Sequence, residues 1–493
     1  MTTTVIQDCC VLDSTHPSGL TEHQDILIQG NMIESVLSTG GQAHAPQVID
    51  GRGLLAVPGL INAHTHSPEN VLRATTEQLP LELWVVRQFA FHNGYPPRLT
   101  YLMTLAGAAE MIHSGITAVL DHFWMARQPD PEGLDAAMQA YDVSGMRVAL
   151  APMLEDQDLI LSRALQLEAS LYKIIENQEK RPAAAELLES LQEFMDRWHG
   201  RANGRLMCMP GPAGPQWCSN RLLQGCQELA QRYATGFHMH MAETHIQAGI
   251  CRTVYGKPAV LEMDTLGLLG PGTSLAHCVW VNKEEIEALA RTGTVVIHNP
   301  VSNLKLGSGI APIPQMLEHG VTVALGTDGA SSNDNQNMFT AMKLMGLLHS
   351  PASHRSRDWL SARQVMAAAT LAGAKALGQP DNLGRIHTGC LADLTLLDLD
   401  QAFWSSATDA IQYTVYSETG SAVRHVIIDG RLVMENRKMI TFPERDIYNE
   451  MQEQMELFLR QNPQPTDELD LLLDTWKSAL HRMDAEENGT NGR

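Results

Sequence analysis

Short apolar runs alternate with helical patterns through the middle of this chain of 493 residues. Tyr101–His113 and Asn282–Arg291 have helical periodicity, and the second begins at Asn282, a good N-cap with Glu285 three residues later. Strands that alternate with helices form parallel sheets with right-handed crossovers. Eight such units predict an α/β fold of the (β/α)₈ TIM barrel type. The eight runs are Leu55–Asn62, Ile116–Asp121, Met146–Ala151, Arg205–Met209, Gly236–Met241, Thr273–His277, Thr294–His298 and Thr322–Gly326.

Further strand-like runs flank this middle section at both ends of the chain. Asp25–Ile28 and Met32–Val36 are joined by Gln29-Gly30-Asn31, a triplet that predicts a β-hairpin turn. The same pattern returns late in the chain, in Ala392–Asp398 and Val423–Gly430. We expect the two ends to pair into one small composite β-sandwich domain.

The chain therefore divides into three predicted parts. They are a composite β-sandwich domain of residues 1–57 and 388–445, a barrel of residues 58–387, and a C-terminal helical extension and tail of residues 446–493. In the extension, Ile447–Arg460 and Leu469–His481 are expected to be helices, and Asp484–Arg493 a disordered tail. The charged segment Asp158–Arg197 favours helix and is expected to be an insertion or an elaborated third helix of the barrel.

The composition restricts the partners of the chain. Lys and Arg number 35 against 56 Asp and Glu, so the formal net charge is −21. Because no basic run stands out, we expect neither nucleic acid nor an anionic membrane to bind. Neither a secretory leader nor an apolar run of about 18 residues is visible, and the eight cysteines form no C-x-x-C pair. We therefore expect a cytoplasmic protein with reduced thiols.

A His-x-His pair, His64 and His66, follows the apolar run Leu54–Ile61, which is typical of a short buried strand. Side chains on a strand repeat every two residues, so both imidazoles should lie on one face. Two nitrogen ligands on one face supply half of the shell that a divalent transition metal needs.

Later segments complete a metal site at the predicted strand ends, where the chemistry of such barrels takes place. His240 ends the fifth strand, and Asp328 follows the eighth. One divalent metal would then bind three imidazoles and one carboxylate, those of His64, His66, His240 and Asp328. Open His/Asp sites are catalytic, and they lower the pKa of bound water from about 15.7 to about 7, which makes hydroxide available as a nucleophile.

We assign catalytic roles to three polar residues from the proton transfers that such a hydrolysis requires. Glu243, three residues beyond His240, would carry a proton to a ring nitrogen of the substrate. His277, at the end of the sixth strand, would hydrogen-bond the metal-bound water or the developing oxygen. Asp328 would take the proton of the water and deliver it to the leaving group. His238 shares the His-x-His spacing with His240 and stays a rival ligand. Further candidates for the mouth of the barrel are His122, His245 and His298.

These segments resemble the amidohydrolase superfamily, and more narrowly its branch of mononuclear-metal aminohydrolases. That branch includes triazine hydrolases, methylthioadenosine/S-adenosylhomocysteine deaminases, and guanine- and cytosine-type deaminases. The similarity covers nearly the whole chain. The matching motifs are Pro58–His66, His240–Glu243, Ala276–Cys278, Asn299–Gly309, Gly326–Gly329, and Leu383–Ile386 with Ala392–Leu394.

The resemblance implies one Zn²⁺ or Fe²⁺ in a TIM barrel with a split β-sandwich, and attack of metal-bound hydroxide on a ring carbon. It also implies a homodimer or homotetramer. Binuclear relatives need a carboxylated lysine on the fourth strand, and Arg205–Met209 contains no lysine. A single-metal site is therefore favoured.

Five residues are predicted to contact the substrate. The loop Leu79–Trp84 resembles one that caps the pocket in relatives. Tryptophans after the second and fourth strands offer stacking area to a planar ring, and a glutamine reads both a donor and an acceptor on a heterocycle edge. The predicted contacts are Trp84, Trp124, Gln216, Trp217 and Asn303.

Three functions remain open at this point. The first is hydrolytic deamination of an amino-substituted purine, pyrimidine, pterin or triazine, with release of ammonia. The second uses the same residues to remove chloride or an alkylamine from a triazine-like ring. The third is an inactive barrel that serves as a binding scaffold. Glu243 favours deamination, because a poor leaving group gains most from protonation of the ring.

Overall fold

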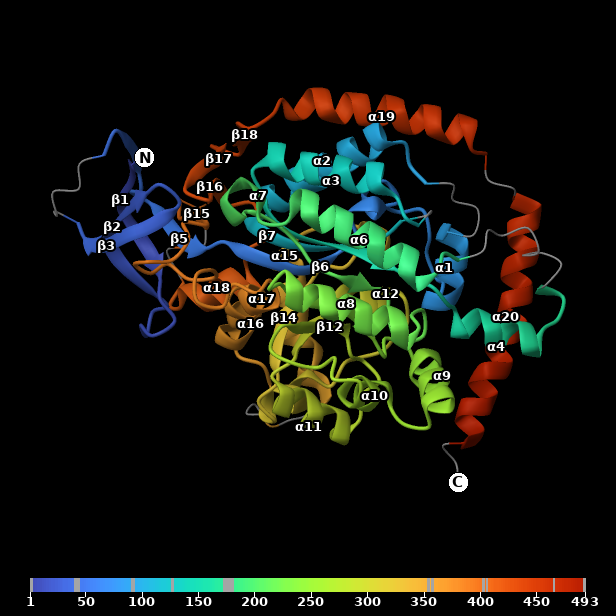
Figure 1. Cartoon of the computed structure of the whole chain (residues 1–493). Helices are drawn as coiled ribbons and strands as arrows, with labels where there is room; N and C mark the ends of the chain where they lie inside the picture. Colours follow the sequence, from blue (N-terminus) through green and yellow to red (C-terminus); the bar gives the residue numbers. More distant parts are fainter. Residues whose placement is uncertain are drawn as a thin grey trace.

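The protein consists of a parallel barrel with a mixed sheet beside it and two long helices at the periphery (Figure 1). The computed structural model describes residues 3–39, 45–89, 94–125, 128–171, 181–352, 355, 359–400, 404, 407–463 and 466–490.

Eight parallel strands form the barrel, and each overlaps one of the predicted runs. They pair in two arcs, β6–β7–β8–β9 and β11–β12–β13–β14. Backbone hydrogen bonds join the arcs: the N–H of Asp328 donates to the carbonyl of His64 at 2.9 Å, and the N–H of His238 donates to the carbonyl of Pro210 at 3.1 Å. The predicted α/β barrel is confirmed. The strands are β6 (Leu60–Thr65), β7 (Ile116–Phe123), β8 (Arg147–Leu154), β9 (Leu206–Cys208), β11 (Phe237–Met241), β12 (Thr273–His277), β13 (Val295–His298) and β14 (Thr322–Leu325), with a short β10 (Gly211–Pro212) beside β8.

Helices surround the barrel and bury its outer face in one large apolar core. The predicted helix near Tyr101 is α2, and the capping box of Asn282 and Glu285 is present at the start of α11. A separate layer of small residues, such as Ala63, Ala118 and Ala324, fills the barrel interior. The helices include α2 (Pro97–His113), α3 (Pro131–Ser144), α6 (Ala184–Trp198), α8 (Asn220–Arg232), α10 (Ala259–Thr265), α11 (Lys283–Thr292), α13 (Ile313–Glu318), α15 (Met338–Leu348), α16 (Ala362–Ala368), α17 (Leu371–Ala376) and α18 (Ala410–Tyr416).

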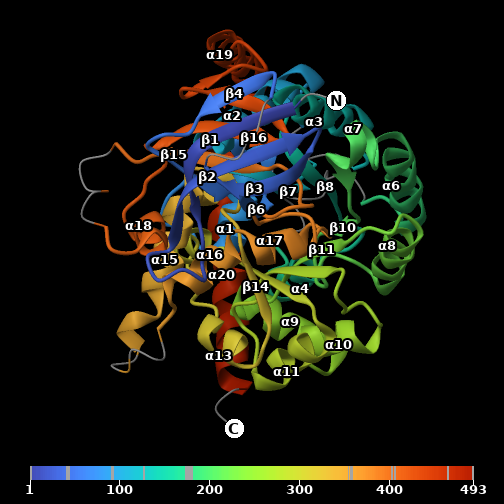
Figure 2. The ribbon, with the colours of Figure 1, turned by 90° about the vertical axis from the view of Figure 1, so that its left-hand side faces the viewer.

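The two ends of the chain pair in one nine-stranded sheet, seen face-on in Figure 2. β5 of the N-terminal segment pairs with the first strand of the C-terminal segment, β15, in antiparallel register. The predicted hairpin is present as β2 and β3, with Gly30 at a left-handed φ of +63° in the turn. The strands are β1 (Thr3–Leu12), β2 (Leu20–Gln29), β3 (Met32–Ser38), β4 (Gln47–Asp50), β5 (Leu54–Pro58), β15 (Leu394–Asp398), β16 (Val423–Ile428), β17 (Arg431–Glu435) and β18 (Lys438–Met439).

The prediction of one strand over Leu54–Ile61 is wrong, because the chain changes sheets in the middle of that run. β5 ends at Pro58, which has no N–H to donate, and β6 begins two residues later in the barrel. Gly59 makes the passage possible: a Cβ there would lie 2.0 Å from Oγ1 of Thr117 on β7.

The C-terminal extension forms two helices, α19 (Glu444–Gln461) and α20 (Thr466–Thr490). The prediction of disorder from Asp484 is wrong up to Thr490, because the helix continues. Its buried stripe includes Leu472, Trp476 and Met483. Beyond the stripe, the carboxylate of Asp484 contacts the ring of His245. The helix α20 packs on α1 (Leu81–Phe89), α4 (Leu159–Leu167) and α9 (His245–Tyr255). Figure 1 shows α20 beside α4.

The segment Asp158–Arg197 contains α4 and most of α6, and its residues 172–180 lie outside the described ranges. All eight cysteines are free thiols, as expected. Among the described helices, none joins the length to the apolar character that a bilayer crossing requires.

Candidate metal centre

His64 and His66 lie together at the carboxyl end of β6. The pairing of β6 with β7 shifts register between Asn62 and Thr65, so the strand is bulged where it delivers the two side chains. Their ring centroids are 4.8 Å apart, and both side chains are buried.

His240 and Asp328 reach the same point from the opposite arc of the barrel. Oδ1 of Asp328 lies 3.4 Å from Nε2 of His64 and 3.3 Å from Nε2 of His66. Nε2 of His240 is 3.3 Å from Nε2 of His66. The four side chains thus converge although they are as much as 264 positions apart in the sequence (328 minus 64).

The Nδ1 atoms of His66 and His240 make hydrogen bonds away from the place where the four side chains converge, which leaves their Nε2 atoms directed toward it. His66 donates its Nδ1–H to the carbonyl of His122 at 2.5 Å, and His240 donates its Nδ1–H to the carbonyl of Ala213 at 2.7 Å. When both rings are neutral, their Nε2 atoms therefore offer lone pairs toward each other. Nε2 of His64 is buried and makes no hydrogen bond within the described part of the chain. Three nitrogen lone pairs and a carboxylate fit a divalent metal ion with imidazole and oxygen ligands.

The pKa values show that the site favours a positive charge beside neutral imidazoles. Burial, followed by the neighbouring His122, holds the pKa of His240 well below its usual range. Burial acts against it, yet the nearby rings of His64 and His66 hold the pKa of Asp328 well below its usual range. Burial also opposes protonation of His66, but Asp328 raises the pKa of His66 to about 9. The carboxylate of Asp328 therefore stays charged among the imidazoles.

Glu243 and His277 stand next to these four residues. His277 donates its Nδ1–H to Oδ1 of Asn303 at 2.8 Å, so its Nε2 is an acceptor, 3.8 Å from Oδ2 of Asp328. Oε1 of Glu243 lies 3.7 Å from Nδ1 of His277 and accepts a hydrogen bond from Ser308 at 3.3 Å. Burial raises the pKa of Glu243 to about 7. The site thus holds a carboxyl group that can donate a proton near neutral pH.

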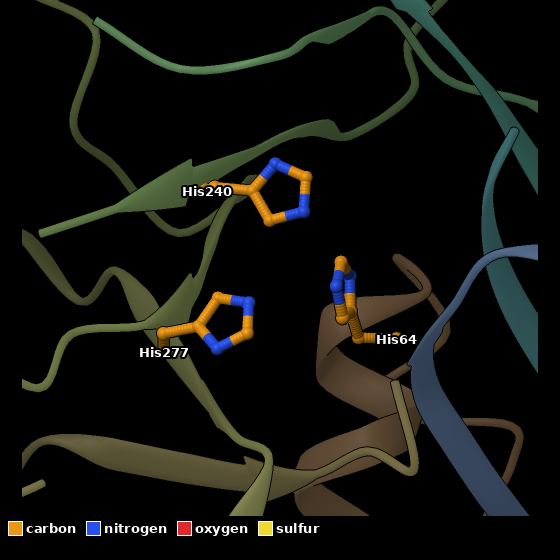
Figure 3. Close-up of side chains that lie close together, drawn as sticks. All are labelled: His64, His240 and His277. Atoms are coloured by element: carbon orange, nitrogen blue, oxygen red, sulfur yellow. The ribbon is translucent and has the colours of Figure 1, made fainter. Parts of the chain in front are cut away.

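Figure 3 shows the rings of His64, His240 and His277 turned toward one another. These three form one of several groups whose ligand atoms lie within 4.8 Å of each other. Other groups bring in His122 and His238, which form a deeper layer. His238, the rival ligand, places its Nε2 2.9 Å from Nδ1 of His64 and its Nδ1 2.8 Å from Oγ of Ser274. It therefore contacts the back of His64.

The predicted substrate contacts occupy different places around the site. Trp217 turns its ring edge-on to His240, with 6.4 Å between centroids. Gln216 is fully buried, and neither atom of its amide has a hydrogen-bond partner among the described residues. Asn303 holds His277, as above. Trp124 is buried directly after β7, and Trp84 packs with Leu81 and Leu306 in a small separate cluster.

Of the three further candidates for the mouth, His122 alone faces the metal ligands. Its ring centroid is 4.7 Å from that of His240. The prediction for His298 is wrong: Val295 and Ile297 of β13 face the barrel interior, and His298, on the other face, approaches His349 of the outer layer. His245 begins α9 and bonds Asp484 of α20 at 2.6 Å, so it lies at the rim.

Two polar residues close to the site are absent from the sequence-based predictions. Ser308 bonds Glu243, and its position in the motif Asn299–Gly309 is the signal that points to it. Gln336 bonds the backbone of Asp328 at 3.2 Å, and no local pattern singles it out. Its role depends on contacts with distant segments.

Comparisons with known proteins agree with this geometry. The sequence matches the profile described as the amidohydrolase family over residues 55–433. A 5'-deoxyadenosine deaminase of Methanosarcina mazei is 32% identical over 453 residues, which cover 92% of this chain and 97% of that protein. A 5-methylthioadenosine/S-adenosylhomocysteine deaminase of Syntrophomonas wolfei is 35% identical over 450 residues, which cover 90% of this chain and 96% of that protein.

Among solved structures, atrazine chlorohydrolase of Arthrobacter aurescens complexed with zinc is similar with a TM-score of 0.82 and 26% identity. The alignment covers 92% of this chain and 99% of that chain. The family profile spans most of the sequence, and relatives above 30% identity span nearly all of it. The chain belongs to the amidohydrolase family.

Proposed function

We propose that this chain hydrolytically deaminates an aminopurine nucleoside and releases ammonia. The observation that carries the proposal is the convergence of three imidazole nitrogens and the Asp328 carboxylate beside a buried carboxyl group, Glu243. Its relatives above 30% identity are named as deaminases of 5'-deoxyadenosine and of 5-methylthioadenosine/S-adenosylhomocysteine. The scaffold hypothesis is less well supported, because a decayed site tends to lose ligands and here all of them converge.

The proposed cofactor is one Zn²⁺, with Fe²⁺ as the alternative. His64, His66, His240 and Asp328 would hold it, in agreement with the zinc of the similar solved structure. When bound, such an ion lowers the pKa of a coordinated water to about 7 and so supplies hydroxide at neutral pH.

The residues around the ion would divide the proton transfers among them. Glu243, whose pKa of about 7 leaves it partly protonated at neutral pH, donates a proton to the ring nitrogen. Nε2 of His277 accepts a hydrogen bond from the attacking water. Asp328 directs Oδ1 toward His64 and His66 and Oδ2 toward His277, so Oδ2 can accept the proton of the water and pass it to the leaving amine.

The substrate ring would lie between Glu243 and the Gln216–Trp217 segment. The amide of Gln216 is buried and has no hydrogen-bond partner among the described residues, which costs free energy unless a ligand satisfies it. Trp217 offers a ring edge beside His240. We include Trp84, Trp124 and Asn303 as further contacts from the walls of the pocket.

The proposal also covers the domain boundaries and the number of subunits. Residues 1–57 with 388–445 would form the composite β domain, residues 58–387 the catalytic barrel, and residues 446–493 the extension. We also propose a homodimer or homotetramer.

A second candidate function is hydrolytic removal of chloride or an alkylamine from a triazine. The similarity to atrazine chlorohydrolase favours it. The deaminase proposal has the stronger support, because the identity to the named deaminases is higher.

One experiment separates the two functions. The zinc-loaded protein is incubated with 5'-deoxyadenosine, 5-methylthioadenosine, adenosine, guanine, cytosine and atrazine, and released ammonia and chloride are measured, with Asp328→Ala as the inactive control. We expect ammonia from a purine nucleoside and none from the control. Chloride from atrazine without ammonia from any nucleoside would favour the second function, and equal ammonia from Asp328→Ala would contradict both.

A further inference from the structure

Asp328 has a left-handed backbone conformation, which residues other than glycine, asparagine and aspartate rarely adopt. Its φ is +64°, in the left-handed region that glycine prefers. Non-glycine residues stay in that region only when the surrounding structure holds them there, and such residues cluster at functional sites. In this conformation Oδ1 of Asp328 lies 3.4 Å from Nε2 of His64 and 3.3 Å from Nε2 of His66.

Hydrogen bonds to the backbone carbonyl of Asp328 help to hold this backbone conformation. It lies 3.2 Å from the Nε2 of Gln336, which donates to it, and 3.0 Å from Oγ1 of Thr65. Thr65 stands between the two ligands of β6, so the same bond ties Asp328 to the strand that carries His64 and His66. The N–H of Asp328 donates to the carbonyl of His64 at 2.9 Å.

Gln336 is the residue that joins both segments. Its Oε1 lies 2.7 Å from Oγ1 of Thr327, 3.0 Å from Oγ1 of Thr65, and 3.2 Å from Nδ2 of Asn62. Asn62 also accepts the backbone N–H of Thr327 at 3.0 Å. The Nε2 of Gln336 therefore donates to the loop that carries Asp328. Its Oε1 accepts from side chains of β6 and of the same loop. It is 1% exposed, so no water replaces these bonds readily.

Residues at the C-terminal end of helix α2 hold the backbone of Gln336 in place. The N–H of Gln336 donates to Oε1 of Glu110 at 3.1 Å, and its carbonyl accepts from Oγ of Ser114 at 3.2 Å. Glu110 is itself paired with Arg73. Because its backbone is anchored, the amide can serve as a fixed support for Asp328.

We propose that Gln336 is a positioning residue for the metal centre, which sets the distance between Asp328 and the two histidines of β6. The inference rests on the metal site proposed above. Within the described residues, the hydrogen bonds of the Gln336 side chain reach no proposed ligand atom; it acts through the backbone carbonyl of Asp328 and the hydroxyl of Thr65. A shell residue that orients a ligand is commonly worth 10- to 100-fold in metal affinity.

The test compares Gln336→Met with the full-length wild-type protein. Methionine keeps the length of the side chain and removes the amide. The matched control is Gln227→Met, the same change on a half-buried glutamine of α8, remote from the metal ligands. Zn²⁺ affinity is measured on metal-free protein by competition with a chromophoric chelator, and the visible spectrum of the Co²⁺-loaded protein reports the coordination geometry. Thr65→Val provides a second variant if Gln336→Met fails to fold.

We expect Gln336→Met to bind Zn²⁺ about 10- to 100-fold more weakly, with an altered Co²⁺ spectrum, and Thr65→Val to lose a smaller factor. Gln227→Met should match the wild type. Zn²⁺ affinity within twofold of the wild type and an unchanged Co²⁺ spectrum in folded Gln336→Met would overturn the inference. If Gln336→Met does not fold, the same result in Thr65→Val would overturn it. Wild-type protein that binds no Zn²⁺ would instead refute the proposed metal site.

Discussion

At the scale of single residues, the proposed chemistry depends on a carboxyl group, that of Glu243, whose protonation is set by burial. Glu243 is 3% exposed, and burial raises the pKa of its carboxyl to about 7. A group with a pKa near the working pH transfers protons most effectively. Glu243 stands 3.7 Å from Nδ1 of His277, outside the four proposed ligands.

Replacement of Glu243 by Gln should slow the reaction without loss of the metal. A positioned general acid is commonly worth about 10²- to 10⁴-fold, so kcat should fall by that factor. The metal content should remain that of the wild type, because the proposed ligands are untouched. Glu287→Gln, an exposed glutamate of α11, is the matched control and should be fully active. An unchanged kcat in Glu243→Gln would mean that another group supplies the proton.

The same carboxyl predicts a pH dependence. The pKa of Glu243 is raised, so the proton needed for the ring is present below about pH 7 and is lost as the pH rises through that value. We expect kcat/KM to fall about tenfold per pH unit on the alkaline side. The profile of Glu243→Gln should lack this limb, since the amide does not titrate. A variant with the same alkaline limb as the wild type would assign the limb to a different group.

At the scale of strands and helices, local patterns identified most elements, and long-range contacts decided the exceptions. The apolar runs between helical patterns predicted the positions of the barrel strands, and the capping box of Asn282 and Glu285 predicted the start of α11. His277 shows what local patterns omit: its φ of +75° turns its side chain away from the alternation of β12. The break at Pro58–Gly59 also depends on a neighbour, because Thr117 on β7 leaves no room for a side chain at Gly59.

This junction gives a prediction about stability. Gly59→Ala would place a Cβ 2.0 Å from Oγ1 of Thr117, so the backbone must shift. Overpacking of this kind costs about 1–3 kcal/mol of the free energy of unfolding. The control, Gly270→Ala, meets nothing within 4 Å and should be close to neutral. Chemical denaturation measures both. Addition of Thr117→Ala should restore part of the loss, and a Gly59→Ala protein as stable as the wild type would refute the steric account.

At the scale of the whole molecule, a buried ion pair ties the C-terminal segment of the mixed sheet to the barrel. Arg147 of β8 donates to Asp393 at 2.7 and 3.0 Å and to Asp429 at 3.2 Å. Each of the three side chains is less than 8% exposed. The sequence predicted that the ends meet, but it could not indicate this link, because its members are as much as 282 positions apart. The helical continuation past Asp484 depends in the same way on distant residues of α4 and α9.

Loss of one partner of this ion pair should destabilise the protein strongly. Asp393→Ala leaves Arg147 buried with only Asp429 beside it, and breaking a buried pair typically costs about 3–5 kcal/mol. Glu450→Ala, which breaks the exposed Arg98–Glu450 pair, is the control and should cost about 1 kcal/mol or less. Urea unfolding monitored by fluorescence compares the two. Equal losses in both variants would show that burial does not set the strength of the pair.

We propose that one metal ion joins side chains from the end of β6 and the residue after it, from β11, and from the loop after β14. The most direct measurement is anomalous diffraction at the zinc edge from crystals of the zinc-loaded protein, together with the metal content per chain. We expect one ion per chain, about 2.0–2.2 Å from Nε2 of His64, His66 and His240 and from a carboxylate oxygen of Asp328. A chain that holds no ion there, or an ion held by His122 and His238 in place of Asp328, would contradict it.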